Sequence, residues 1–238
     1  MNVYEIGSVE EKLKSNTYPG RGIILGITPD KTKKVAAYFI MGRSSNSRNR
    51  IFKTEEDGIS TEAFDPSLLE DPSLIIYHPV RELGDDLIVT NGDQTDTVYN
   101  GMKNGESFEA ALRTREFEPD GPNWTPRISG IQHADGSYAM SILKSVDIEG
   151  SACVREFFEF PAVAGLGHFI HTYVTDGDPI PTFVGEPERV AMLDDIDEFT
   201  DMLWNSLNDA NKISLFVRYT DIEDGSCEQA VINVHEEA

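Results

Sequence analysis

The chain has 238 residues, of which 39% are hydrophobic and 26% are charged, and its formal net charge at pH 7 is −22. These proportions are those of an ordinary soluble globular protein, and the length allows one domain with a full core or two small ones. The acidic balance argues against nonspecific binding to nucleic acid, which needs a basic surface, and the lack of an apolar run of about 18 residues argues against a membrane-spanning segment.

The N-terminal stretch MNVYEIGSVEEKLKSN has no apolar core behind a basic start, so we expect that it is not a signal peptide. The two cysteines, Cys153 and Cys227, are far apart and fit no metal-binding or redox spacing. We therefore expect reduced thiols in a cytoplasmic protein, with neither a metal ion nor another cofactor.

The first predicted elements are a short helix and a hairpin. In SVEEKLKS, Ser8 and Glu11 are spaced as in a capping box, which predicts a helix over residues 8–15. Residues 18–27 and 35–42 are apolar runs on either side of the turn sequence TPDKTKK, which predicts a hairpin with both strands largely buried. The chain after Phe52 is an acidic patch rich in turn residues.

Strands and helices alternate through the rest of the chain. Residues 73–83 and 86–93 are predicted to pair around Gly84-Asp85, and residues 127–133 and 137–145 around Asp135-Gly136. Between these pairs the pattern is helical over residues 94–115, with a break at Asn104-Gly105. Strands are expected at residues 152–160, 167–175, 213–220 and 228–235, and an amphipathic helix at residues 194–209, with one apolar face made of Ile196, Phe199, Leu203 and Leu207.

This order of elements predicts an α+β fold. Adjacent strands are joined by short turns, so the sheets should be mostly antiparallel, and two sheets packed face to face with helices outside accommodate all the elements. We expect one domain over residues 1–238. The strands of the two sheets are expected to include Leu25, Val35, Tyr38, Ile40, Ile75, Ile88, Ile128 and Leu215.

Positive charge gathers in one window of this acidic chain. Residues 20–54 contain eight bases and one acid, so the window carries +7 and the rest of the chain −29. Arg21 begins one predicted strand and Arg43 follows its hairpin partner, so the two side chains should meet at one end of the hairpin. Arg48 and Arg50 follow in the next loop, and Arg127 enters from another hairpin. The arginines therefore predict an anion site, since the guanidinium fork suits phosphate or carboxylate; salt bridges to surface acids are the alternative.

Four motifs, GRGIILG, AAYFIMGRSSNSRNR, TNGDQTD and NWTPRISGI, together resemble the archaeal-type IMP cyclohydrolase family. The resemblance runs from about Tyr18 to Arg127 and continues more weakly through HFIHTYVTDGDPIPTF. It implies a four-layer αββα sandwich like that of the N-terminal nucleophile hydrolases. This chain differs by an N-terminal extension over residues 1–17, a C-terminal extension and an arginine segment that is two residues longer, so it looks like a bacterial branch of the family.

The resemblance implies a reaction and a substrate: closure of the purine ring of 5-formamidoimidazole-4-carboxamide ribotide, with loss of water, to give IMP. It also implies Tyr77 and Glu118 as acid–base groups and Arg43 as a further catalytic residue. Tyr77 is alternatively a core aromatic, and Glu118 an exposed loop carboxylate with which Glu116 and Asp120 compete.

The resemblance places the substrate's phosphate on the arginines. Asp93 of TNGDQTD either contacts the ligand or caps the following helix. The residues expected to bind the substrate are Arg21, Arg48, Asn49, Arg50, Asn91, Asp93, Thr95, Thr125 and Arg127. His168 and His171 are three residues apart on a predicted strand and so face opposite sides, which disfavours a shared metal ion.

Three functions remain open from the sequence. The first is an IMP cyclohydrolase, and the second is a noncatalytic or drifted purine-nucleotide-binding protein with the same pocket. The third is an amidohydrolase of the N-terminal nucleophile type, which needs a Cys, Ser or Thr where this chain has Tyr18-Pro19-Gly20. A small purine nucleotide is the expected partner, nucleic acid and membranes are not, and a homo-oligomer is compatible with the sequence.

Overall fold

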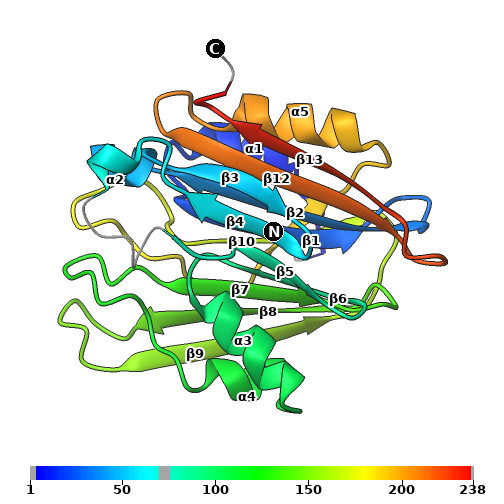
Figure 1. Ribbon diagram of the computed structural model, residues 1–238, viewed down its shortest axis with the longest axis horizontal. Coiled ribbons are helices and arrows are strands. Elements are labelled where there is room, and N and C mark those ends of the chain that lie inside the picture. The colour runs from blue at the N-terminus through cyan, green and yellow to red at the C-terminus, as the bar shows by residue number, and fades with distance from the viewer. Residues whose placement is uncertain (1–3, 70–75, 237–238) are drawn as a thin grey trace.

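The computed structural model describes residues 4–69 and 76–236. Within these residues the chain forms two antiparallel sheets, one of six strands and one of seven, together with five α-helices (Figure 1). No helix in these two ranges is long and apolar enough to cross a bilayer.

The six-stranded sheet is built around the first hairpin. In this sheet β1 and β2 are central, and β11 and β13 form the edges, in the order β11-β10-β1-β2-β12-β13. Its strands are β1 (Arg21–Ile27), β2 (Lys33–Met41), β10 (Leu166–His171), β11 (Glu188–Ala191), β12 (Lys212–Asp221) and β13 (Cys227–Asn233).

The seven-stranded sheet follows chain order from β3 at one edge to β9 at the other, because each strand pairs with the next one. Its strands are β3 (Ile51–Glu55), β4 (Gly58–Glu62), β5 (Val80–Leu83), β6 (Asp86–Thr90), β7 (Arg127–Gln132), β8 (Tyr138–Ser145) and β9 (Cys153–Phe160).

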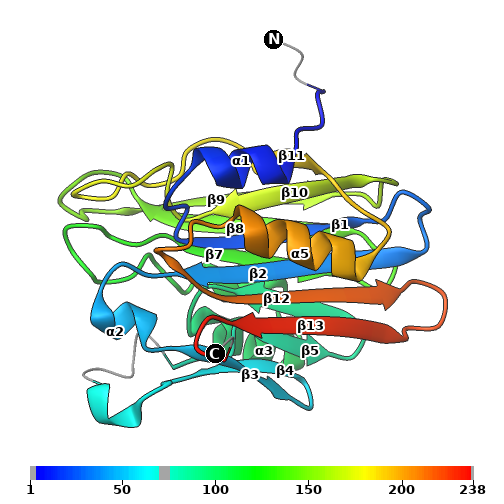
Figure 2. The ribbon, with the colours of Figure 1, turned by 90° about the horizontal axis from the view of Figure 1, so that it is seen from above.

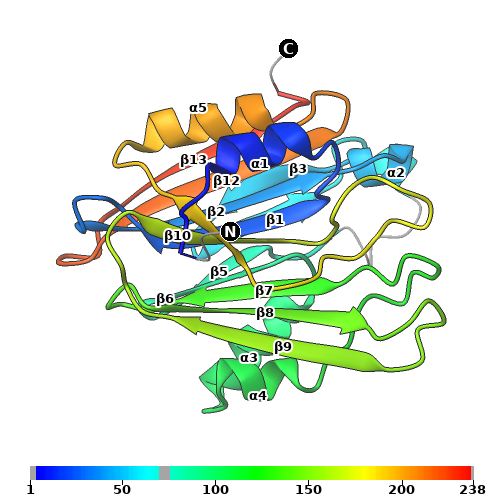
Figure 3. The same ribbon diagram turned by 180° about the vertical axis from the view of Figure 1, so that it is seen from behind.

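The helices lie on the outer sides of the sheets. Figures 2 and 3 show α1 (Val9–Ser15) and α5 (Ile196–Ser206) over the six-stranded sheet, and α3 (Gln94–Lys103) and α4 (Phe108–Leu112) against the seven-stranded one. The one-turn helix α2 (Ser45–Arg48) follows β2, and a 3₁₀ turn spans Pro66–Leu68. Ser8 caps α1 as predicted, since its hydroxyl accepts a hydrogen bond from the backbone N–H of Glu11 at 3.2 Å.

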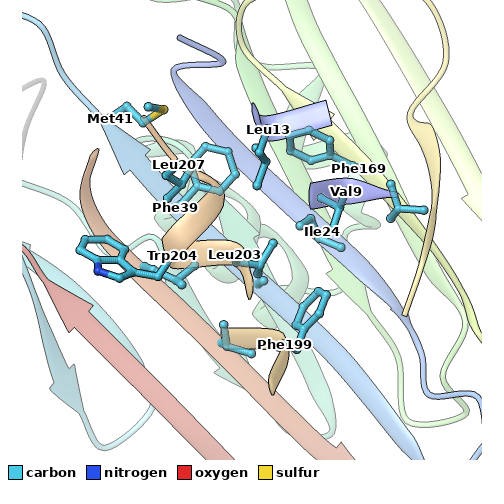
Figure 4. Close-up of a cluster of buried hydrophobic side chains, with 14 of the residues drawn as sticks. Val9, Leu13, Ile24, Phe39, Met41, Phe169, Phe199, Leu203, Trp204 and Leu207 are labelled. Atoms are coloured by element: carbon cyan, nitrogen blue, oxygen red, sulfur yellow. The ribbon is translucent and has the colours of Figure 1, made fainter. Parts of the chain in front are cut away.

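Alternation along the strands divides the apolar residues into three clusters. On β1, Ile24 faces α1 and α5, whereas Ile23 and Leu25 face the other sheet. This explains why β1 and β2 are apolar without a break: both of their faces are covered. The first cluster, beneath α1 and α5, is drawn in Figure 4. The second contains residues of both sheets, and the third lies between the seven-stranded sheet and α3 and α4.

The α+β class and the two mostly antiparallel sheets are confirmed, as are the three predicted hairpins. The helical region breaks at Asn104 and Gly105 as expected, because Asn104 ends α3 and Gly105 has a φ of +88°. The residues expected on strands lie there, except Ile75, which falls outside the described residues. Cys153 and Cys227 are free thiols.

The sequence prediction missed the hairpin of β3 and β4, which occupies the acidic patch after Phe52. Only Phe52 and Ile59 of this hairpin enter the core between the sheets, so the apolar alternation is too short to stand out. The prediction also missed β11 and α2.

Tyr77 was expected on a strand and lies instead just before β5. Its backbone runs beside β4, where it accepts a hydrogen bond from the N–H of Thr61 and donates one to the Thr61 hydroxyl, both at 2.9 Å. Pro79 follows two residues later and has no N–H to donate, which delays the start of the strand.

Truncating a buried ring in the cluster beneath α1 and α5 should destabilise the protein. Phe39 is fully buried there, 6.0 Å from the ring of Phe169. We expect Phe39→Ala to lower the free energy of unfolding by about 3–5 kcal/mol in urea titration, because it leaves a cavity. Ile148→Ala is the control, since that side chain is 78% exposed, and it should cost less than about 0.5 kcal/mol. Equal midpoints for the two variants would contradict this assignment of the core.

Candidate active site

A cavity of about 320 Å³ opens at the end of the first hairpin where β1 begins and β2 ends. Four segments line it: the start of β1, the end of β2 with α2, the loop between α4 and β7, and the loop after β10. The lining residues are Tyr18, Arg21, Arg43, Ser44, Asn46, Ser47, Glu118, Asp120, Asn123, Thr125, Tyr173 and Ile180.

Arg21 is fixed at the entrance to β1 by its neighbours. Gly20 precedes it with a φ of +79°, and a Cβ there would lie 2.2 Å from the Thr172 hydroxyl, so only glycine fits this approach. The backbone N–H of Arg21 donates to that hydroxyl at 3.1 Å. Burial alone would lower the pKa of Arg21, but the carboxyl of Glu118 and nearby phenols outweigh it and raise the pKa. The buried Nε of Arg21 has no hydrogen-bond partner among the described residues.

Arg50 is the most unusual group at this end of the protein. It is fully buried, and its Nε donates to the carbonyl of Ser47 at 2.8 Å. Within the described part of the chain, its Nη1 and Nη2 have no hydrogen-bond partner. Burial, and then the positive charge of Arg21, lower the pKa of Arg50. An unpaired buried cation costs free energy, and an anion bound between the two guanidinium groups would offset that cost.

Two phenols lie within electrostatic reach of these arginines. The hydroxyls of Tyr38 and Tyr77 are hydrogen-bonded at 2.9 Å, and both side chains are buried. Burial raises the pKa of Tyr38 well above its ordinary value, against the opposing charges of Arg21 and Arg50. The structure therefore places Tyr77 beside Arg50 in the interior and not among the residues that line the cavity.

Glu118 supplies the acidic side of the cavity. It lies in the loop between α4 and β7 and is only 4% exposed. Burial raises its pKa, although the charges of Arg21 and Arg127 partly oppose this. Its Oε1 lies 4.0 Å from Nη1 of Arg127. Gly92 permits this arrangement, because a Cβ there would lie 2.7 Å from the same Nη1.

Asp120, Thr125 and Tyr173 form a hydrogen-bonded wall beside Glu118. The carboxylate of Asp120 accepts from the N–H of Thr125 at 2.7 Å and also bonds its hydroxyl. That hydroxyl lies 2.6 Å from the Tyr173 hydroxyl, and burial raises the pKa of Tyr173 to about 12. Glu116, in contrast, is largely exposed and pairs with Arg155 at 3.7 Å, away from the cavity.

The TNGDQTD segment is hydrogen-bonded to the chain that follows the Glu118 loop. Asn91 donates to the carbonyl of Pro126 and accepts from the N–H of Ile128, both at 2.9 Å. Asp93 stands at the N-cap position of α3, but its carboxylate pairs with Arg115 and Arg127 instead of capping the helix. Thr95 lies 2.6 Å from the Thr90 hydroxyl.

The predicted anion cradle is therefore brought together only in part. Arg21 and Arg43 do meet at the cavity, whereas Arg50 is fully buried and is not among the residues that line it, although its charge interacts with that of Arg21. Arg43 is paired with Asp176 and lies 5.1 Å from the ring centroid of Tyr18. Arg48 points away and donates to the carbonyls of Ala210 and Gly42.

Asn49 also turns away from the cavity and exchanges two hydrogen bonds with the backbone of Asp65.

Sequence reasoning missed most of the aromatic and amide lining. Tyr18 and Tyr173 stack with ring centroids 5.8 Å apart, although 155 positions in the sequence separate them. Asn46, Ser47 and Asn123 also line the cavity. The only signal for the tyrosines was their presence in the motif segments, because strand patterns do not show which loops meet.

Comparison with known proteins identifies relatives of this chain. The family described as IMP cyclohydrolase-like protein matches residues 18–225. A protein named IMP cyclohydrolase from Methanococcus maripaludis is 34% identical over 156 residues, which cover 60% of this chain and 75% of that protein. One from Methanopyrus kandleri is 29% identical over 181 residues, covering 70% and 89%, and one from Methanococcus aeolicus is 25% identical over 160 residues, covering 66% and 74%.

The unpaired state of Arg50 predicts an unusual effect on stability. In phosphate-free buffer we expect Arg50→Met to raise the free energy of unfolding by about 1–4 kcal/mol, because it replaces a buried charge with an apolar side chain. The matched control is Arg218→Met. Arg218 is 7% exposed, but it pairs with Glu82 and Gln229, so its loss should destabilise by about 1–3 kcal/mol. A destabilised Arg50→Met protein would show that Arg50 is already neutralised.

Proposed function

Since the chain belongs to the IMP cyclohydrolase-like family, we propose that it is an IMP cyclohydrolase. It would close the pyrimidine ring of 5-formamidoimidazole-4-carboxamide ribotide, with loss of water, in purine nucleotide biosynthesis. The observation that carries the proposal is one cavity lined both by Arg21, whose Nε has no hydrogen-bond partner among the described residues, and by Glu118, a buried carboxyl whose pKa is raised.

The cationic side fits the 5′-phosphate of a purine nucleotide. Phosphate accepts several charge-assisted hydrogen bonds at once, and the guanidinium fork offers donors in matching geometry. Among the residues that the structure describes, two nitrogens of Arg50 and one of Arg21 have no partner, while the acidic net charge of the protein gives no general attraction for anions. We propose that Arg21 and Arg50 hold the phosphate and that Thr125 contacts the rest of the nucleotide.

The acidic side fits the proton transfers of ring closure. The carboxamide nitrogen attacks the formyl carbon, the new N–C bond forms, and the electron pair of the C=O bond moves to oxygen. The attacking nitrogen loses a proton, and the oxyanion takes one up from solvent to become a hydroxyl. The hydroxyl is then protonated and leaves as water, while the formamido nitrogen loses its proton to solvent and the C=N bond forms. A carboxyl with a raised pKa can accept the first proton and return it to the leaving hydroxyl, so we assign this role to Glu118.

Other residues are assigned by their place around the cavity. Arg43 is proposed to stabilise the negative charge that develops on the formyl oxygen, because its cation lines the same cavity as Glu118. Tyr77 is proposed as a phenolic donor, since its hydroxyl lies with that of Tyr38 next to the arginines. The remaining predicted residues are proposed to hold the walls: Asn91, Asp93, Thr95 and Arg127 behind Glu118, and Arg48 and Asn49 in the arginine segment.

We also propose that the chain is one domain with the four-layer αββα arrangement of the N-terminal nucleophile hydrolases. The cluster of buried residues shared by both sheets supports this, as does the position of the helices on their outer sides. The nucleophile of those hydrolases has no counterpart here, because Tyr18-Pro19-Gly20 stands before β1. The amidohydrolase alternative is therefore disfavoured.

The phosphate assignment predicts a difference between nucleotide and nucleoside. Arg21→Met should weaken IMP binding at least about tenfold in calorimetry, because one charge-assisted contact is worth about 1.5–3 kcal/mol. Inosine, which lacks the phosphate, should lose less than about twofold. Arg48→Met is the control, since that side chain bonds only backbone carbonyls, and it should leave the ratio of the two affinities unchanged. Equal losses of IMP and inosine in Arg21→Met would refute the cradle.

The acid–base assignment predicts a pH effect. If the carboxylate of Glu118 is the active form, kcat falls as the pH drops through its pKa, and this limb should lie above the ordinary glutamate value of about 4.5 because the pKa is raised. Glu118→Gln should lower kcat by about 10²-fold or more, with little change in KM, and should abolish the limb.

Tyr77→Phe serves as the companion variant, because it keeps the ring and removes only the hydroxyl. It should lower kcat by about tenfold without moving the acidic limb. An acidic limb that persists in Glu118→Gln would reassign the titrating group. Wild-type protein that binds IMP but forms none would instead indicate a noncatalytic nucleotide-binding protein.

A further inference from the structure

The C-terminal segment lies outside the part of the chain that matches the family, which ends at residue 225. It forms β13, the edge strand of the six-stranded sheet, and then turns back toward the arginine segment. Figure 2 shows β13 next to β3, the edge strand of the other sheet. The segment therefore meets the chain on both sides of Arg50.

Asn233 ties the two sheet edges together. Its Nδ2 donates to the carbonyl of Phe52 at 3.0 Å, and its Oδ1 accepts from the N–H of Phe52 at 2.8 Å. The side chain thus bonds both polar groups of one backbone residue, as a neighbouring strand would. It is 3% exposed and is itself fixed by the hydroxyl of Ser214, which donates to Oδ1 at 2.7 Å.

His235 holds the chain on the other side of Arg50. Its Nε2 lies 2.8 Å from the carbonyl oxygen of Arg48, and a carbonyl only accepts, so Nε2 carries the hydrogen. Its ring stacks on Phe64 with centroids 4.2 Å apart. The backbone is therefore held two residues before and two residues after Arg50.

The position of the backbone matters because the guanidinium of Arg50 makes few contacts that fix its own position. Its only hydrogen bond within the described residues is the one from Nε to Ser47, and the charge of Arg21 repels it. A donor that is positioned before the ligand arrives loses less freedom on binding, so the affinity for the ligand depends on the backbone that carries Arg50.

We propose that Asn233 and His235 are positioning residues that set Arg50 for the phosphate of the substrate. The segment after residue 225 would thereby tune the affinity of this chain for nucleotides. This inference rests on the proposed role of Arg50 as a phosphate ligand.

The test compares IMP with inosine in Asn233→Ala. We expect the Kd for IMP and the KM for the ribotide to rise about tenfold, because two hydrogen bonds that orient the segment are lost, while kcat and the Kd for inosine change less than about twofold. Glu228→Gln is the matched control on the same strand. It removes an exposed ion pair with Lys33 at the opposite end of β13 from Asn233, and it should bind both ligands as the wild type does.

A merely structural role would lower the melting temperature and weaken both ligands equally, and this result would overturn the proposal. So would an unchanged preference for IMP. If Asn233→Ala fails to fold, the test uses His235→Ala, which should weaken IMP binding about threefold. His235→Gln keeps a donor for the Arg48 carbonyl and should restore the affinity. Wild-type protein without any preference for IMP over inosine would remove the phosphate cradle itself, and the positioning proposal with it.

Discussion

Arg50 is a buried cation with two nitrogens that find no partner in the described protein, and it stands beside a second cation, Arg21. Such a pair destabilises the unliganded fold, so the surrounding structure has to hold it in place. Gly20 and Thr172 fix the start of β1 under Arg21, and the C-terminal segment fixes the backbone around Arg50. An anion bound between the two arginines would offset this repulsion, which is why we propose that this end of the protein binds the phosphate of the substrate.

The two sheets contribute different chemistry to one cavity. The six-stranded sheet brings Arg21 and Arg43 through its central hairpin, whereas the loop that leads into the seven-stranded sheet brings Glu118. Burial raises the pKa of that carboxyl, although the charges of Arg21 and Arg127 partly oppose the shift, and Gly92 leaves room for Arg127 beside it. In the proposed function the phosphate site and the proton-transfer group would thus face one cavity from different sheets, which would position the two reacting groups of the substrate for ring closure.

Much of this was predictable from the sequence, for physical reasons that also explain what was not. Continuous apolar runs and short turns indicate the central hairpin, so the meeting of Arg21 and Arg43 follows from strand pairing alone. The direction of Arg48 did not follow, because it depends on a one-turn helix and on the carbonyl of Ala210 far along the chain. Tyr77 was expected on a strand, but Pro79 delays β5. The contacts from which we propose roles for Asn233 and His235 join the C-terminal segment to the arginine segment and to β3, and periodicity does not reveal such contacts.

A crystal structure of the protein soaked with IMP would test directly whether Arg50 and Arg21 bind the phosphate of the nucleotide. The account predicts phosphate oxygens about 2.7–2.9 Å from Nη1 and Nη2 of Arg50, with Arg21 on the same phosphate and the purine directed toward Glu118. A nucleotide whose phosphate lies elsewhere, with both nitrogens of Arg50 still unpaired, would contradict it.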